Sequence, residues 1–197
     1  MTTSAPTREE ALAILKEFNK ADRAIRHATA VEAVMRHFAR KKGQDEEKWG
    51  VIGLIHDLDY EQFPSEHCKK TAEILRSRGW PEEYIRSAVS HGWGLCSDVE
   101  PTSEMEKVLY AADELTGLVA ATALVRPSRS LADLEPRSVK KKWKEKGFAA
   151  GVNREVIEKG AAMLGVELTA FIEDVIAAMG TVAAELGLAG TGTSAGQ

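Results

Sequence analysis

The sequence contains few residues of the kinds that mark secreted or membrane proteins. Two of its 197 residues are cysteine, Cys68 and Cys96, and they form no C-x-x-C pair, so we expect reduced thiols rather than a disulfide framework. No stretch approaches the roughly 20 apolar residues of a membrane-spanning helix, and residues 1–8 lack the apolar segment of a signal peptide. We therefore expect a cytoplasmic protein with no membrane partner.

The chain also has no large excess of charge of either sign. Its formal net charge of −4 at pH 7 is small and has the wrong sign for a general nucleic-acid-binding protein, so we expect no such partner. Hydrophobic residues make up 44% of the chain, which is enough for a substantial core. No stretch alternates between apolar and polar residues as a half-buried strand does. These features predict a single all-α domain.

Helical spacing of apolar residues predicts at least seven helices. We expect them over residues 8–20, 22–42, 45–58, 65–79, 81–92 and 103–124, and, after a looser stretch, in two further segments of which the first starts at Asn153. Gly43 is a predicted stop signal, and Ser103 with Glu106 forms a capping box. The last helix carries an apolar stripe that fits either the core or a homodimer interface, formed by Phe171, Val175, Met179 and Val182.

The first of the five histidines lies on an apolar helix face. His27 shares a stripe with Val31, Val34 and Phe38, at steps of four, three and four residues, so we expect it to face inward. An isolated inward histidine is ordinarily a hydrogen-bonded core residue. His37 lies off that stripe and is predicted to be on the surface.

Two aspartates fall inside apolar helical segments. His56 and Asp57 sit in the most apolar one, and Asp113 lies within LYAADELTGLVAA. A buried carboxylate must be paired, protonated or bound to a cation. A buried salt bridge to Lys107 or Arg126 would satisfy Asp113 taken alone. A divalent cation would neutralise both carboxylates and also accept imidazole nitrogens. His67 and His91 are each either an ordinary polar residue at a helix end or a functional residue, and their positions alone do not decide between the two.

The order His27, His56-Asp57, Asp113 resembles the H…HD…D signature of the HD superfamily of metal-dependent phosphohydrolases. The approach LIHDLDY, the segment EHCKKTAEILRSRGWPEEYIRSAVSHG and the helix EKVLYAADELTG are similar to the corresponding parts of that superfamily. The likeness extends from about Ala24 to Gly117. The remainder resembles the C-terminal part of a bacterial group of predicted HD hydrolases.

The resemblance implies an HD-type helical bundle with additional C-terminal helices. Its core would cover about residues 22–125 and its extension 126–188, within one domain 9–188 between a flexible segment 1–8 and a disordered tail 189–197. The resemblance also implies one or two divalent transition-metal ions, and histidine-rich ligation favours Mn, Fe, Co, Ni or Zn. The first ion would bind His27, His56, Asp57 and Asp113. His67 and His91 match the extra ligands of the dinuclear branch, in which Asp57 would bridge two ions.

One departure from the family pattern concerns phosphate binding. Many relatives read HDIGK, whereas this chain continues with Leu58-Asp59-Tyr60 and lacks that lysine. The segment 126–146 holds eight basic residues against three acidic ones. It is either a solvated helix face or a source of contacts to an anionic phosphorylated substrate. The candidate substrate-binding residues are Arg129, Lys141 and Lys142.

These features together predict a phosphohydrolase that uses a metal-activated hydroxide on a phosphoester of a nucleotide or a phosphorylated metabolite. Two alternatives remain. Some HD proteins with the same six ligands use a di-iron centre to oxidise their substrates with O₂. Others are non-catalytic nucleotide-binding or signalling modules, and the complete ligand set argues against that reading.

Overall fold

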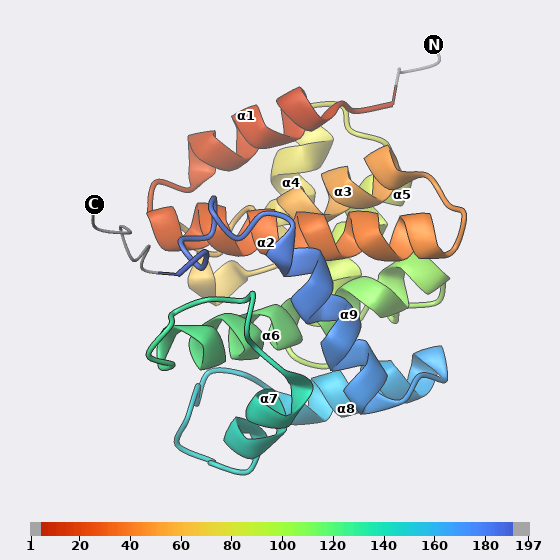
Figure 1. Ribbon diagram of the computed structural model, residues 1–197. Coiled ribbons are helices and arrows are strands. Elements are labelled where there is room, and N and C mark those ends of the chain that lie inside the picture. The colour runs from red at the N-terminus through yellow and green to blue at the C-terminus, as the bar shows by residue number, and fades with distance from the viewer. Residues whose placement is uncertain (1–4, 191–197) are drawn as a thin grey trace, which may run out of the picture.

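The computed structural model describes residues 5–190 of the chain, which fold into helices (Figure 1). Within that range there is no strand, only two isolated β-bridges. The helices are α1 (Arg8–Phe18), α2 (Asp22–Lys41), α3 (Glu46–Ile55), α4 (Lys69–Ser77), α5 (Glu82–Val89), α6 (Glu104–Leu124), α7 (Pro136–Trp143), α8 (Arg154–Leu164) and α9 (Leu168–Gly180), with short 3₁₀ turns η1 (Pro64–Glu66) and η2 (Ser90–Gly92). The all-α prediction is confirmed.

Several predicted helix ends are confirmed by their capping contacts. Ser103 and Glu106 form the expected capping box at the start of α6, with both reciprocal hydrogen bonds present. Asn153 caps α8 through its side-chain oxygen. Gly43 follows α2 with a φ of +64°, the left-handed conformation that suits glycine. Local sequence chemistry therefore determines where these helices begin and end.

The helix predicted over 45–58 ends earlier than expected. It stops at Ile55, and the chain continues through turns that bury Leu58 and Asp59 completely. The side chain of Asn19 donates a hydrogen bond to the Leu58 carbonyl at 2.9 Å, which satisfies a backbone group that a longer helix would have paired. An apolar run buried on every side has no period that distinguishes a helix from a buried turn.

Other elements also differ from the prediction. The helix predicted over 65–79 begins later than expected, because Ser65 lies inside η1 and α4 begins only after Cys68. Helix α7 was not predicted, because its eight residues contain one buried apolar side chain, Val139, and so carry no apolar stripe. Helix α9 ends at Gly180, so Val182 lies just beyond it.

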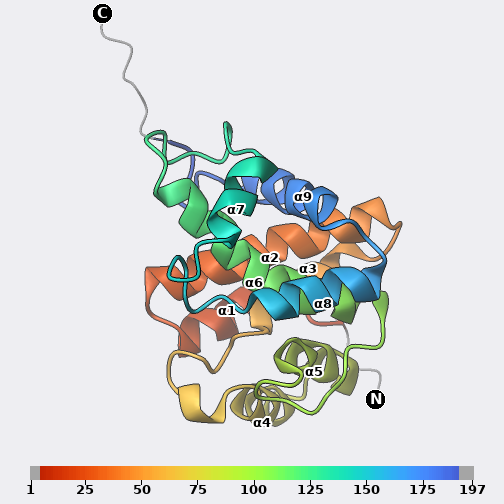
Figure 2. The ribbon, with the colours of Figure 1, turned by 90° about the horizontal axis from the view of Figure 1, so that it is seen from below.

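Helix α2 lies at the centre of the fold, packed against α3, α6 and α9 (Figure 1). A view from below places the α4–α5 pair on one side of this layer, α7 and α9 on the opposite side, and α8 along α6 (Figure 2). The predicted stripe of Val31, Val34 and Phe38 is buried. A Cβ on Gly53 of α3 would lie 2.9 Å from the backbone of Glu32, so glycine lets α3 approach α2 closely.

Both ends of the described chain make contacts with the helical body. Thr7 caps α1, and Arg8 forms an ion pair with Glu32 at 2.6 Å. Ala189 forms an antiparallel bridge with Ser130, so this first residue of the predicted tail is held in place. Residues 1–4 and 191–197 of the two predicted loose segments lie outside the described residues. Between 5 and 190, no helix has the combined length and hydrophobicity to cross a membrane.

Candidate metal centre

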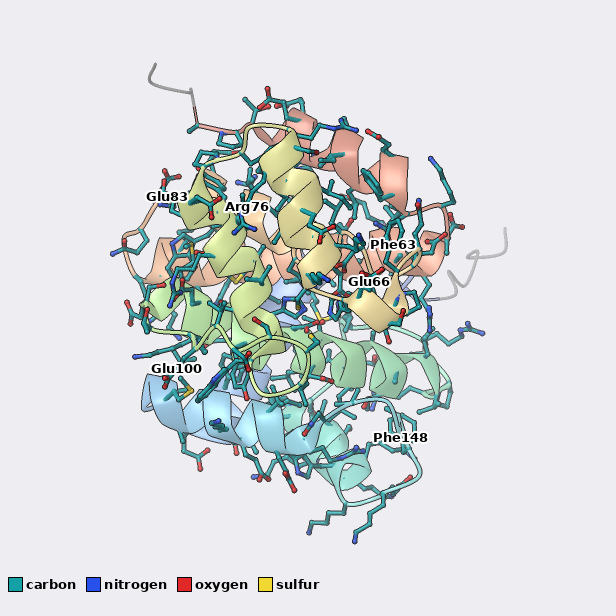
Figure 3. All side chains as sticks on the ribbon, turned by 180° about the vertical axis from the view of Figure 1, so that it is seen from behind. Phe63, Glu66, Arg76, Glu83, Glu100 and Phe148 are labelled. Carbon is teal, nitrogen blue, oxygen red and sulfur yellow. The ribbon has the colours of Figure 1, made fainter. Side chains whose placement is uncertain are left out.

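Five separate segments bring six metal-ligating side chains together. The contributors are α2 with His27, the turn after α3 with His56 and Asp57, the residue after η1 with His67, η2 with His91, and the middle of α6 with Asp113. Figure 3 shows the face formed by α4, α5 and the adjoining loops. Phe63 and Glu66 mark the segment that leads to His67, and Glu100 marks the loop after His91.

The first group of donors is centred on His27. Its Nε2 lies 2.9 Å from Asp113 Oδ1, 3.3 Å from His56 Nε2 and 3.5 Å from Asp57 Oδ2. The ligand atoms of these four residues all lie within 4.8 Å of one another. The predicted first ligand set therefore converges on one point, which could hold a metal ion.

A second group of donors shares Asp57 with the first. The other oxygen of Asp57, Oδ1, lies 3.4 Å from His67 Nε2 and 3.3 Å from His91 Nε2, and these two nitrogens are 3.1 Å apart. Asp57 thus directs Oδ2 toward one group and Oδ1 toward the other. This is the arrangement that a carboxylate bridging two cations requires.

Backbone carbonyls fix the orientation of two of these imidazoles. The Nδ1 of His56 lies 2.8 Å from the Gly53 carbonyl, and the Nδ1 of His91 lies 2.6 Å from the Ala88 carbonyl. A carbonyl only accepts hydrogen bonds, so each Nδ1 carries a hydrogen and each ring turns its Nε2 toward the cluster. Nitrogens and carboxylate oxygens that converge in this way need positive charge between them, which protons or a metal ion can supply. The donor set therefore fits a metal ion.

His67 is oriented by a residue that the sequence interpretation did not identify. Its Nδ1 lies 2.7 Å from Oδ1 of Asp59, whose other oxygen accepts the backbone N–H of Thr71 at 2.7 Å. Asp59 is fully buried. Burial lowers the pKa of His67, but the bond to Asp59 outweighs this and raises the pKa to about 11. The sequence did contain one signal for this role. Where many relatives read HDIGK, this chain has an aspartate, Asp59, two positions after Asp57.

The electrostatics of the cluster favour positive charge among its carboxylates. Burial alone would raise the pKa of both Asp57 and Asp113, but the nearby His56 holds both below the usual range. Burial would lower the pKa of His27, yet its hydrogen bond to Asp113 raises that pKa to about 9. Burial and the neighbouring Asp113 raise the pKa of Glu114 to about 6. A divalent cation bound among these residues would supply that positive charge in place of the protons on the histidines.

The basic residues predicted to bind substrate lie on the C-terminal extension. Arg129 and Lys141 are exposed, and Lys142 forms an ion pair with Glu145 at 2.8 Å. Among the described residues, no hydrogen bond or ion pair joins these three side chains to the cluster. Phe148, labelled in Figure 3, lies under the Lys142 ammonium group, which is 4.8 Å from its ring centroid.

Two other side chains, His37 and Trp93, have structural partners. His37, predicted to be on the surface, is about one quarter exposed and lies 3.0 Å from Asp174 Oδ1, outside the cluster. Trp93 is partly buried beside Tyr110, and the ammonium group of Lys159 lies 3.4 Å from its ring centroid. This cation–π contact holds the loop that follows His91 against α8.

The comparison with protein families agrees with this geometry. The family model of the HD domain matches residues 24–118, a range that contains all six clustered side chains. Residues 24–118 form an HD domain. The HD domain supports membership of a superfamily of metal-dependent hydrolases, and its His/Asp cluster could hold the metal. Neither a curated protein nor a solved structure gives a significant match to the chain.

Proposed function

We propose that the protein is a metal-dependent phosphohydrolase that cleaves a phosphoester of a nucleotide or a phosphorylated metabolite. The observation that carries the proposal is the position of Asp57, which directs one carboxylate oxygen toward each of two donor groups. Four imidazoles and two carboxylates suit Mn, Fe, Co, Ni or Zn better than Mg. Because two donor groups meet at Asp57, we propose two ions rather than one.

Bound ions of this kind supply a water of lowered pKa and positive charge for the phosphoryl oxygens. The contribution of the chain is to hold the donors in place. Carbonyls keep His56 and His91 in the tautomer that presents Nε2, and Asp59 does the same for His67. Donors that are fixed before the substrate binds need little rearrangement during the reaction.

The first test compares metal content and activity in the wild type and in Asp57→Ala. We expect the variant to lose most of its metal and essentially all hydrolysis of a panel of phosphomonoesters and phosphodiesters, because each donor group loses one oxygen of the Asp57 carboxylate. Elemental analysis and product assays measure these effects, and circular dichroism checks that the variant stays helical. His37→Ala is the matched control, since His37 pairs with Asp174 outside the cluster. A fully active Asp57→Ala protein would refute the proposal.

The same measurements separate the proposal from its two alternatives. An iron-loaded protein that consumes O₂ with an organic substrate, and hydrolyses no phosphoester, would be an oxygenase with the same six donors. A folded protein that takes up no metal would be a binding module. The complete donor set and its fixed tautomers support a metal-loaded protein.

For the substrate, we propose that cations of the extension replace the lysine missing from the HD motif. Tyr60 stands at that lysine's position, is about half exposed and packs its ring 5.0 Å from the His67 ring. Arg129, Lys141 and Lys142 would then contact the substrate phosphate. We expect Lys141→Ala with Lys142→Ala to raise KM without changing the melting temperature. Lys140→Ala, on the same helix but bonded to Thr169, is the control. An unchanged KM would remove these residues from the substrate site.

A further inference from the structure

The two cysteines, 28 residues apart in sequence, meet beside the second donor group. Their sulfur atoms are 3.1 Å apart. Cys68 directly follows His67, and Cys96 lies in the tight turn that follows His91. The cysteine pair therefore links the two segments that carry the second group's imidazoles. No step of the proposed hydrolysis uses either thiol.

The backbone around the pair leaves room for both sulfur atoms. A Cβ on Gly92 would overlap the sulfurs of Cys68 and Cys96 alike, so only glycine permits their approach at this point. The carbonyl of Gly92 accepts the backbone N–H of Cys96 at 2.9 Å and that of Ser97 at 3.0 Å, which holds the turn in register. Cys68 has a φ of +67°, an unfavourable conformation for a residue with a side chain. Two separate backbone features thus accompany the sulfur contact.

The two thiols differ in their access to solvent. Cys96 is exposed, whereas Cys68 is 2% exposed. A reagent in solution therefore meets Cys96 first, and Cys68 can react only with its neighbour. This combination of an accessible and a buried thiol in contact suits the formation of an intramolecular disulfide.

We propose that Cys68 and Cys96 form a reversible disulfide that ties the His67 segment to the His91 segment. The oxidant is a low-molecular-weight disulfide, RSSR. The Cys96 thiolate attacks one sulfur of RSSR, which forms a mixed disulfide and releases RS⁻. The Cys68 thiolate then attacks the Cys96 sulfur and releases the second RS⁻. The two thiol protons pass to the released thiolates, so two cysteines and RSSR give one protein disulfide and two RSH.

Formation of the bond would move the second donor group very little, but it would restrict the motion of His67 and His91 relative to each other. A disulfide has a sulfur–sulfur distance of about 2.05 Å, so the sulfurs need to approach by roughly 1 Å. The covalent link then restricts separation of the two segments. This inference rests on the proposed metal centre for its effect on metal retention, but it does not depend on hydrolysis.

The test uses the full-length protein as isolated, treated with oxidised glutathione and analysed by intact mass and thiol titration. We expect a loss of two hydrogen atoms and of both thiols in the monomer, reversed by dithiothreitol. Because the chain has only these two cysteines, that mass change identifies the bond. We expect the oxidised form to melt roughly 5–10 °C higher than the reduced form and to release metal severalfold more slowly to a chelator.

Cys96→Ser is the control, since the exposed position tolerates a hydroxyl group, and its melting and metal release should not respond to oxidised glutathione. Thiols that stay free, a glutathione adduct that persists on Cys96, or a disulfide-linked dimer would each overturn the proposal. So would zinc that protects both thiols in stoichiometric amount, because the pair would then be a metal site. An inactive protein that still forms the bond and still retains metal more strongly when oxidised would refute only the proposed hydrolysis.

Discussion

The Asp59 carboxylate accepts the ring hydrogen of His67 through one oxygen and the backbone N–H of Thr71 through the other. The position of this imidazole therefore depends on a residue that is not among the six clustered donors. Outer partners of this kind set the tautomer and raise the basicity of the ligand they contact. Metal binding by the second donor group should therefore be sensitive to substitution of Asp59, which contacts that group through one hydrogen bond.

We expect Asp59→Asn to weaken binding of the second ion by about 10–100-fold while the first ion stays bound. The amide cannot supply negative charge to His67, and its NH₂ group opposes either the ring N–H or the Thr71 N–H. Competition titration with a metal-sensitive dye measures both ions. The control is Asp98→Asn, an exposed aspartate on the loop after the second donor group. Equal loss of both ions, or of neither, would contradict the prediction.

At the scale of the elements, α6 is held at its start by one buried glutamate. The carboxylate of Glu106 accepts the backbone N–H of Thr102 at 2.8 Å and of Ser103 at 2.9 Å, and it pairs with Arg86 at 2.5 Å. Burial alone would raise the pKa of Glu106, but these bonds outweigh it and lower that pKa below its ordinary value of 4.5. The start of the helix that carries Asp113 is therefore stabilised by an ionised carboxylate.

We expect Glu106→Gln to reduce the free energy of unfolding at pH 7 by about 1–3 kcal/mol. Because the folded-state pKa is lowered, the stabilisation by Glu106 is fully present above about pH 4.5 and is lost as the pH falls through the folded-state value. The difference between wild type and variant should therefore shrink below about pH 4.5. Urea unfolding across this range measures it. Glu104→Gln, in the same turn but more than half exposed, should show little effect at any pH.

The elements also show why sequence reasoning succeeds in some places and fails in others. His27 could be oriented in advance because α2 is long and its stripe of Val31, Val34 and Phe38 has a clear helical period. The role of Asp59 could not be predicted from that kind of pattern. It lies in a buried turn whose course depends on Asn19, a residue 40 positions away. Contacts at such separation leave no periodic trace in the sequence.

At the scale of the whole molecule, the order of residues and the family likeness predicted which six side chains converge, but not how the C-terminal extension packs on α2 and α6. The short helix α7 gave no signal, and the cysteines gave no sign of their contact because nothing in the sequence relates 68 to 96. The extension nevertheless packs on the helices that carry donors. A Cβ on Gly160 of α8 would overlap Ala111 of α6, and Phe171 of α9 lies 5.4 Å from Phe38 of α2, measured between ring centroids.

We expect a shortened protein that ends at residue 125 to be insoluble or to lack a cooperative thermal transition. Removing α7–α9 would expose the apolar faces of α2 and α6 that Ile157, Phe171 and Val175 now cover. Size-exclusion chromatography and a melting curve followed by circular dichroism test this. The comparison is a protein that ends at residue 190, which should behave as the full chain. A soluble, cooperatively melting and metal-binding fragment 1–125 would contradict the expectation.

The contact between Gly160 and Ala111 has a consequence for how variation can accumulate in this chain. The HD domain matches residues 24–118, but the helices that pack into one folded unit extend well beyond residue 118. Every side chain larger than hydrogen at position 160 would push on the helix that holds Asp113, about 50 residues earlier in the chain. Changes in the part of the chain after residue 118 are therefore constrained by a centre to which that part contributes none of the six clustered side chains.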